Sequence, residues 1–194
     1  MSKLHANWSL HSVLLLALIA PAAVLGQENF YKGKTIRFIV AYEPGGGFDV
    51  YTRTIARHFG KHIPGNPTTL VENMTGAVGM IAANHLYHQA KPDGLTIGHF
   101  VGTLVLQQVL GNEAAKFDGR KFGWLGVPVA DHGVCALTKA SGISSLEGWL
   151  ASKEPLKMGG HGPGGVTSDT ARILREAIGL PVRVIDGYKC TGPI

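Results

Sequence analysis

The sequence has few cysteines, few acids and no long run of one charge. Its 194 residues include two cysteines and 13 Asp and Glu against 18 Lys and Arg, and only 16% of the chain is charged. The basic residues stand singly, without the stripe that nucleic-acid binding requires, so we expect no nucleic-acid partner. Spacing alone does not show whether Cys135 and Cys190 form a pair. With 45% hydrophobic residues, the chain is too apolar for the highly charged, core-poor class of disordered proteins.

The longest apolar run is short for a membrane anchor. Residues 13–25 are all apolar, follow a start that carries Lys3, and lead to Gly26. A basic start, about thirteen apolar residues and a small-residue exit are the three parts of a secretory signal peptide. A transmembrane anchor is the competing interpretation, but it needs roughly 20 apolar residues, and Pro21 interrupts this run. We therefore expect residues 1–26 to be a signal peptide that directs export.

Beyond this segment, strand-like and helical patterns alternate. Strands are expected at 35–42, 68–71, 95–101, 124–129, 134–139, 156–159 and 182–185, and helices at 49–59, 77–90, 104–110 and 167–178, with a further short helix opened by the capping-box pair Ser144 and Glu147. This alternation predicts an α/β fold with a parallel or mixed sheet. The polar stretch 111–123 indicates a lobe boundary, which we place between residues 27–118 and 119–194.

Glycine is abundant, with 27 residues, and it clusters at Gly45–Gly47, at Gly76 and Gly79, and at 159–165. Each cluster lies between an expected strand and an expected helix. Such a loop presents backbone N–H groups at close range, and the helix N-terminus behind it adds partial positive charge, so it can bind an anion without Lys or Arg. Tight turning alone is the alternative for any single loop. Three such loops in one chain favour a binding cleft.

One enzyme-like pattern remains as an alternative. Gly160–Gly165 satisfies G-x-G-x-x-G, and Asp186 ends the next expected strand, which is the dinucleotide-binding fingerprint. An NAD(P)-dependent oxidoreductase is therefore a second hypothesis, although Pro163 stiffens this turn. The histidine pairs at 58 and 62 and at 85 and 88 lack a third ligand at useful spacing, so we expect no metal site.

Several motifs in order carry a resemblance to a known family. They are Lys34–Val40 followed by Pro44–Asp49, Val71–Asn73 with Gly76 and Gly79, Lys91–Ile97, Gly162–Gly164 with Ser168 and Asp169, and Gly187–Lys189. On these residues the sequence resembles the receptors of tripartite tricarboxylate transporters, the Bug family. The resemblance covers nearly all of the chain after residue 26. It implies a two-lobed, periplasmic-binding-protein-like fold that closes over a small carboxylate in the periplasm.

The resemblance also implies a role for particular residues. The expected ligand-binding residues are Gly45, Gly46, Gly47, Phe48, Asp49, Gly162, Gly164, Gly165, Thr167, Ser168 and Asp169. The two aspartates are expected to cap helices and shape the loops, because a carboxylate would repel an anionic ligand. The receptor is expected to be a monomer without catalytic activity or cofactor, and to deliver its ligand to the membrane subunits of a transporter.

Three departures from the family pattern accompany these expectations. Phe48 stands where a small residue is usual, which predicts a narrower or stacked pocket mouth, and Cys190 stands where glycine is usual. Family members also continue well past residue 194, so the second lobe is expected to be incomplete. A truncated fragment without function is accordingly the third hypothesis.

Overall fold

The computed structural model describes residues 30–130 and 133–188. The elements follow in the order β1 (Thr35–Val40), α3 (Gly47–Phe59), β2 (Thr68–Asn73), α4 (Met80–His88), β3 (Thr96–His99), α5 (Thr103–Val109), α6 (Leu146–Leu150), β4 (Leu156–Gly160), α7 (Val166–Ile178) and β5 (Val182–Asp186), with short 3-10 helices at Gly60–His62, Ala77–Gly79, Gly119–Lys121 and Lys139–Ser141. The strands form a three-stranded parallel sheet of order β2-β1-β3 and a two-stranded parallel sheet of β4 and β5. The predicted α/β class is confirmed.

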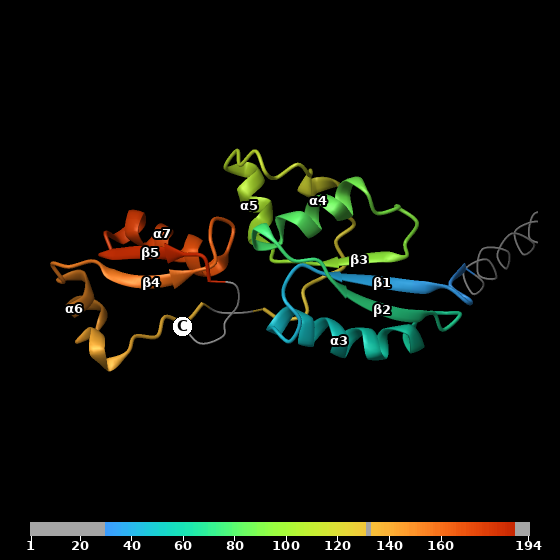
Figure 1. Cartoon of the computed structure of the whole chain (residues 1–194), viewed down its shortest axis with the longest axis horizontal. Helices are drawn as coiled ribbons and strands as arrows, with labels where there is room; N and C mark the ends of the chain where they lie inside the picture. The colour runs from blue at the N-terminus through green and yellow to red at the C-terminus, as the bar shows by residue number, and fades with distance from the viewer. Residues whose placement is uncertain (1–29, 131–132, 189–194) are drawn as a thin grey trace, which may run out of the picture.

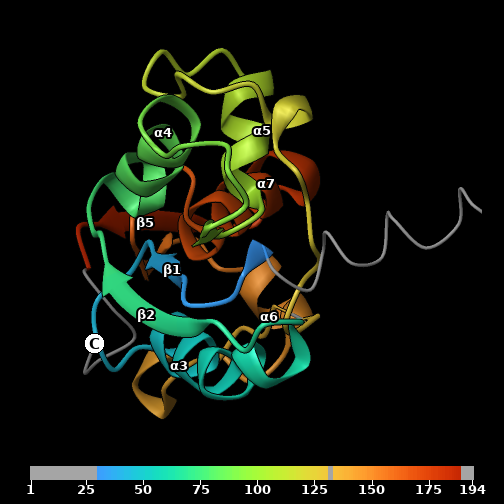
Figure 2. The same ribbon diagram turned by 90° about the vertical axis from the view of Figure 1, so that its right-hand side faces the viewer.

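The first sheet lies between helices (Figures 1 and 2). The central strand β1 alternates its side chains between two layers, as any strand does. Ile36 and Phe38 pack with Ala56 of α3, whereas Ile39 packs with Ala82 of α4 on the opposite face. Because both faces are covered, β1 is buried over most of its length, which explains its nearly continuous apolar sequence.

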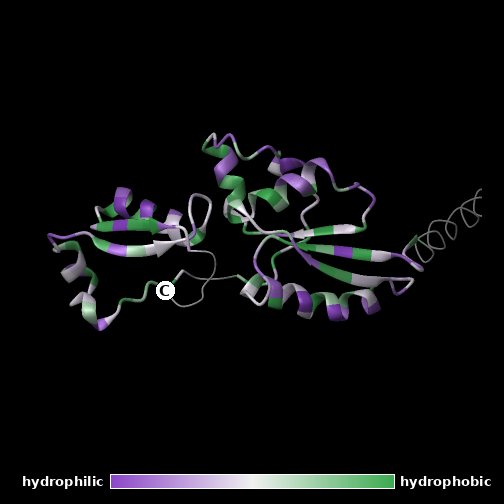
Figure 3. Cartoon of the chain, in the orientation of Figure 1, coloured by the Kyte–Doolittle hydropathy of each residue, from purple (hydrophilic) through white to green (hydrophobic). Residues whose placement is uncertain are grey.

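The second sheet is covered on one side by α7 and α6 (Figure 1). Its core is the cluster of Trp149, Ala171, Leu180 and Val182. Hydrophobic residues accordingly follow both strands, while hydrophilic residues line the outer side of α7 (Figure 3). The first sheet with α3, α4 and α5 is here called the first unit, and the second sheet with α6 and α7 the second unit. Both sheets point the carboxyl ends of their strands toward the junction between the two units (Figure 1).

Most predicted elements are confirmed, and the strands at 35–42, 68–71, 95–101, 156–159 and 182–185 end within two residues of their expected bounds. The strands predicted at 124–129 and 134–139 are wrong, since none of their residues belongs to a strand. Their composition is strand-like, but a strand also needs a neighbour with which to exchange hydrogen bonds. Here the segment runs exposed, with Leu125 77% and Val134 94% accessible.

Two helix starts differ from expectation. Ser145, and not Ser144, is the N-cap of α6, where its hydroxyl accepts a hydrogen bond from the N–H of Gly148. At α3 the N-cap is Gly46, so Asp49 lies inside the first turn and does not occupy the cap position.

The predicted end of α7 at Gly179 is confirmed, because this glycine adopts the left-handed conformation of a helix C-terminus.

None of the described helices is long and apolar enough to cross a membrane. The predicted signal peptide, residues 1–26, lies outside the described residues, as does Cys190. The predicted division of the remaining chain at residue 118 stays a prediction.

Candidate functional site

Asp49 organises the loop that follows β1. Its side chain is 5% exposed, and its carboxylate accepts hydrogen bonds from the N–H of Gly45 at 2.9 Å, from Arg53 Nε at 2.9 Å and from Asn73 Nδ2 at 2.9 Å. The hydrogen bond from Arg53 is the main reason that the pKa of Asp49 falls from 3.8 to about 2. The carboxylate is therefore ionised and fully engaged within the loop.

The loop that follows β4 is organised in the same way. The hydroxyl of Ser168 is completely buried, accepts a hydrogen bond from the N–H of Gly162 at 2.8 Å and donates one to Asp186 at 2.7 Å. The carboxylate of Asp169 accepts from the N–H of Gly164 at 3.1 Å. In both lobes, an acid in the first turn of a helix thus holds a glycine N–H of the preceding loop.

These contacts change which backbone donors a ligand could meet. The N–H groups of Gly45, Gly162 and Gly164 bond to side chains, and those of Gly46 and Gly165 bond to the carbonyls of Glu43 and Gly162. None of these five is directed to a ligand in this structure. The first-turn N–H groups of α3 and α7, at residues 47–49 and 166–168, lack intrahelical acceptors and remain available by helix geometry.

A turn that was not among the predicted ligand-binding residues lies between these loops. It follows β2 and spans residues 75–79, and two of its non-glycine residues have positive φ, with Ala77 at 45° and Val78 at 56°. The left-handed backbone conformation is unfavourable for a β-branched residue such as valine, and it persists only where surrounding contacts stabilise it. The Tyr42 hydroxyl donates to the Val78 carbonyl at 3.3 Å, and burial raises the pKa of Tyr42 to about 12, so this donor stays protonated.

A pocket of about 190 Å³ lies at this turn. Its lining residues come from both units: Ala41, Tyr42, Glu43, Thr75, Gly76, Ala77, Val78, Gly79, His161 and Tyr188. None of the eleven predicted ligand-binding residues is among them. The two predicted loops instead flank the pocket, since Glu43 lies two residues before Gly45 and His161 lies directly before Gly162. The glycine cluster at 76 and 79 was the sequence signal that pointed to the missed turn.

Direct contacts join the two units beside the pocket. The Thr103 hydroxyl donates to the carbonyl of Gly164 at 2.7 Å, and Gln107 Nε2 donates to Asp169 at 3.0 Å. Helix α5 of the first unit therefore holds the loop that follows β4 in the second. A Cβ built on Gly165 would lie 3.2 Å from a methyl group of Val78, so glycine allows close approach at this contact.

Phe48 stands where the family usually has a small residue, and its ring packs against two aromatic rings of the first unit. Its ring centroid lies 4.4 Å from that of Tyr42 and 4.7 Å from that of His99. Burial lowers the pKa of His99, and the Thr52 hydroxyl lies 2.7 Å from its Nδ1. The Phe48 ring thus supports Tyr42, which in turn holds the turn at Val78.

The acid of the dinucleotide-binding fingerprint, Asp186, is already engaged by other side chains. Asp186 accepts from the Ser168 hydroxyl and forms an ion pair with Arg172, so both of its oxygens tie β5 to α7. A ribose would have to displace these partners. Among the described residues, no group of three or more His, Cys, Asp or Glu side chains could hold a metal ion.

No protein-family model and no curated protein matches the chain, whereas several solved structures do. MatC from Rhodopseudomonas palustris with bound malate is similar at 23% identity and a TM-score of 0.59, over 82% of this chain. A TctC solute-binding protein from Polaromonas gives 22% and 0.51, and the periplasmic binding protein BugD gives 19% and 0.56, each over 84% of this chain. The chain spans 55% of the length of each.

The chain therefore has the α/β fold of the TctC and Bug type of periplasmic binding proteins, as the sequence motifs predicted. At these identities, the likeness shows the fold and leaves the ligand to be argued from the pocket.

Proposed function

We propose that this protein is a periplasmic substrate receptor of the tripartite tricarboxylate transporter type, which binds a small carboxylate between its two lobes and presents it to membrane subunits. The proposal rests mainly on which strands the pocket-lining residues follow. Its residues directly follow the carboxyl ends of β1, β2, β4 and β5. In open α/β sheets, ligands bind in the crevice outside these strand ends. A pocket shared by two lobes also fits hinge closure around a ligand.

The lining favours a small anion held by hydrogen bonds. Neither lysine nor arginine is among the lining residues, and the one acid, Glu43, is exposed. The 3-10 turn at Ala77–Gly79 begins with N–H groups that have no acceptor inside the turn. A volume of about 190 Å³ is below the range of pockets for drug-sized ligands, which favours a compound of a few carbon atoms.

The two aspartates of the flanking loops are compatible with an anionic ligand. Asp49 is compensated by Arg53, and Asp169 lies 3.4 Å from Arg172. Their charge is therefore locally balanced, while their oxygens fix the two loops that flank the pocket. We propose that Asp49 and Asp169 shape the site without contacting the ligand, and that the helix first turns behind these loops supply the favourable field.

A thermal-shift screen of small carboxylates tests the receptor function. Malate, citrate, butyrate and glutamate are added to the purified chain, with NADH as the competing ligand. A ligand present at a hundredfold excess over its Kd should raise Tm by about 5–10 °C. A saturable NADH response without any carboxylate response would instead favour the oxidoreductase. No response to any of these compounds from a folded chain would favour the fragment without function.

Export is tested separately from binding. We propose that residues 1–26 are removed and that the mature chain is periplasmic. Fractionation of cells that express the complete chain should place the protein in the periplasmic extract, and N-terminal sequencing should begin near Gln27. A protein that stays in the membrane fraction and still begins at Met1 would show that the apolar run acts as an anchor.

A further inference from the structure

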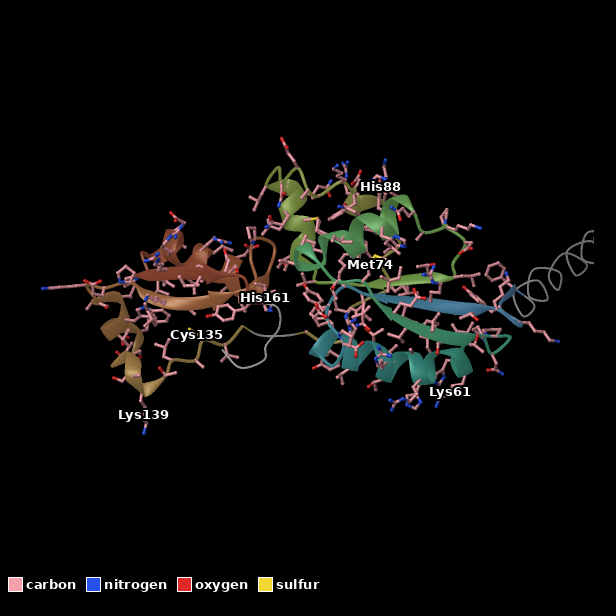
Figure 4. The ribbon with its side chains drawn as sticks, in the orientation of Figure 1. Lys61, Met74, His88, Cys135, Lys139 and His161 are labelled. Carbon is pink, nitrogen blue, oxygen red and sulfur yellow. The ribbon has the colours of Figure 1, made fainter. Side chains whose placement is uncertain are left out.

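His161 is the one pocket-lining residue of the second lobe that carries a side-chain nitrogen. It directly follows β4, and it lies at the end of the second lobe that faces the first (Figure 4). The other lining residue from this lobe is Tyr188. The N–H groups of Gly162 and Gly164 bond to side chains of α7, and that of Gly165 bonds to the carbonyl of Gly162, so these three loop donors are already engaged.

Thr167 engages one ring nitrogen of this histidine. Its Oγ1 accepts a hydrogen bond from the backbone N–H of His161 at 3.4 Å and lies 3.1 Å from the ring Nδ1. A threonine hydroxyl has one proton to donate and two lone pairs that accept, so Thr167 either donates to Nδ1 or accepts from an Nδ1–H. In the arrangement in which Thr167 donates, Nδ1 is unprotonated and the ring proton is on Nε2, the nitrogen that Thr167 does not engage.

We propose that the Nε2–H of His161 binds an oxygen of the ligand and selects ligands that carry an acceptor at the end facing the second lobe. This inference rests on the proposed receptor function. The first lobe offers the backbone donors of the turn at Ala77–Gly79, and the second offers this imidazole. A ligand with oxygens at both ends satisfies both lobes at once and stabilises the closed state. A ligand of the same length with one carboxylate satisfies only one lobe.

The tautomer is measured without any ligand. In a two-bond proton–nitrogen correlation spectrum of the ¹⁵N-labelled full chain, the His161 ring should show the pattern of the Nε2–H tautomer. Thr167→Val keeps the side-chain shape and removes the hydroxyl, so it should shift His161 toward a mixture of tautomers. A wild-type ring protonated on Nδ1 would overturn the inference.

Selectivity is measured with malate and butyrate, two four-carbon acids of which only malate carries a second carboxylate and a hydroxyl group. His161→Ala should weaken malate binding about tenfold, the loss of roughly one hydrogen bond to a charged group, and should change butyrate binding less than about twofold. His161→Gln should keep most of the malate affinity, because its amide N–H₂ can replace Nε2–H. The matched control His62→Ala removes an exposed imidazole from the 3-10 helix Gly60–His62 and should change neither affinity.

Circular dichroism of each variant separates a lost contact from lost folding. An equal loss of malate and butyrate affinity in folded His161→Ala, or unchanged malate affinity, would overturn the role of this residue. A wild-type chain that binds none of the carboxylates would overturn the proposed function and with it a ligand-binding role for His161. The tautomer measurement would still decide the Thr167 contact in that case.

Discussion

Replacing Asp49 by alanine should lower the free energy of unfolding by about 3 kcal/mol, because three donors lose one buried acceptor. The N–H of Gly45 and the amide of Asn73 would be left without the carboxylate, while Arg53 can turn to solvent. Asp49→Asn should lose less, since its amide oxygen can still accept. Urea unfolding measures both, and the exposed control Glu113→Ala should stay within about 0.5 kcal/mol of wild type.

The stability that Asp49 contributes should also depend on pH. Its pKa is lowered in the folded protein from 3.8 to about 2, so its contribution is complete above pH 3.8 and is lost as the pH falls toward about 2. The linked free energy is about 2 kcal/mol. The stability difference between wild type and Asp49→Ala should therefore shrink by this amount between pH 7 and pH 2. A difference that does not change with pH would contradict the ion pair with Arg53.

Asp49→Ala should also weaken carboxylate binding if the proposed function holds, because the loop after β1 would lose its anchor. A variant that is destabilised but binds with unchanged affinity would restrict Asp49 to folding. If Asp49→Asn instead binds the anion much more tightly, the carboxylate faces the ligand directly, which would contradict its proposed role in shaping the loop.

Replacing Trp149 by alanine should have the largest effect on stability, about 4 kcal/mol. The residue is 5% exposed in the second core, and its Nε1 donates to the carbonyl of Pro181 at 3.1 Å. The other buried residues of that cluster are Ala171, Leu180 and Val182, which are all much smaller than tryptophan and cannot fill the space. Amide hydrogen exchange should show that β4, β5 and α7 lose protection while β1 keeps it.

Trp124→Ala is the matched control for this prediction. Trp124 is 56% exposed, although its Nε1 donates to the carbonyl of Gly119 and its ring packs edge-on against Phe122. Its removal should cost no more than about 2 kcal/mol, because only part of the ring is withdrawn from water. Equal losses from the two substitutions would show that the second core contributes less than its burial indicates.

Local patterns predicted the elements that depend on neighbours in the chain. The β-branched and aromatic run of β1 and the glycine that ends α7 act over a few residues, so both were confirmed. Segment 124–139 has the same strand-like composition, but strand formation requires a partner, and composition does not report one.

The position of the glycine loops follows from the same local preferences. The loops after β1 and β4 lie between strands and helices, as expected. The expectation that their N–H groups are free does not hold for Gly45, Gly162 and Gly164, because side chains accept from these groups. Ser168 and Asp169 follow the glycines they hold by only a few residues, yet a spacing does not reveal which way a side chain turns.

The sequence by itself determined the order of strands, glycine turns and helices, because the preferences behind them act within about one helical turn. Only the tertiary structure decided which groups meet. Asn73 reaches Asp49 from 24 positions away, and Gln107 reaches Asp169 from 62. The pocket joins Tyr42, Val78 and His161, because parallel strands bring their carboxyl ends to one edge of each sheet and the two edges face each other. The distance between these residues along the chain does not indicate that they meet in the fold.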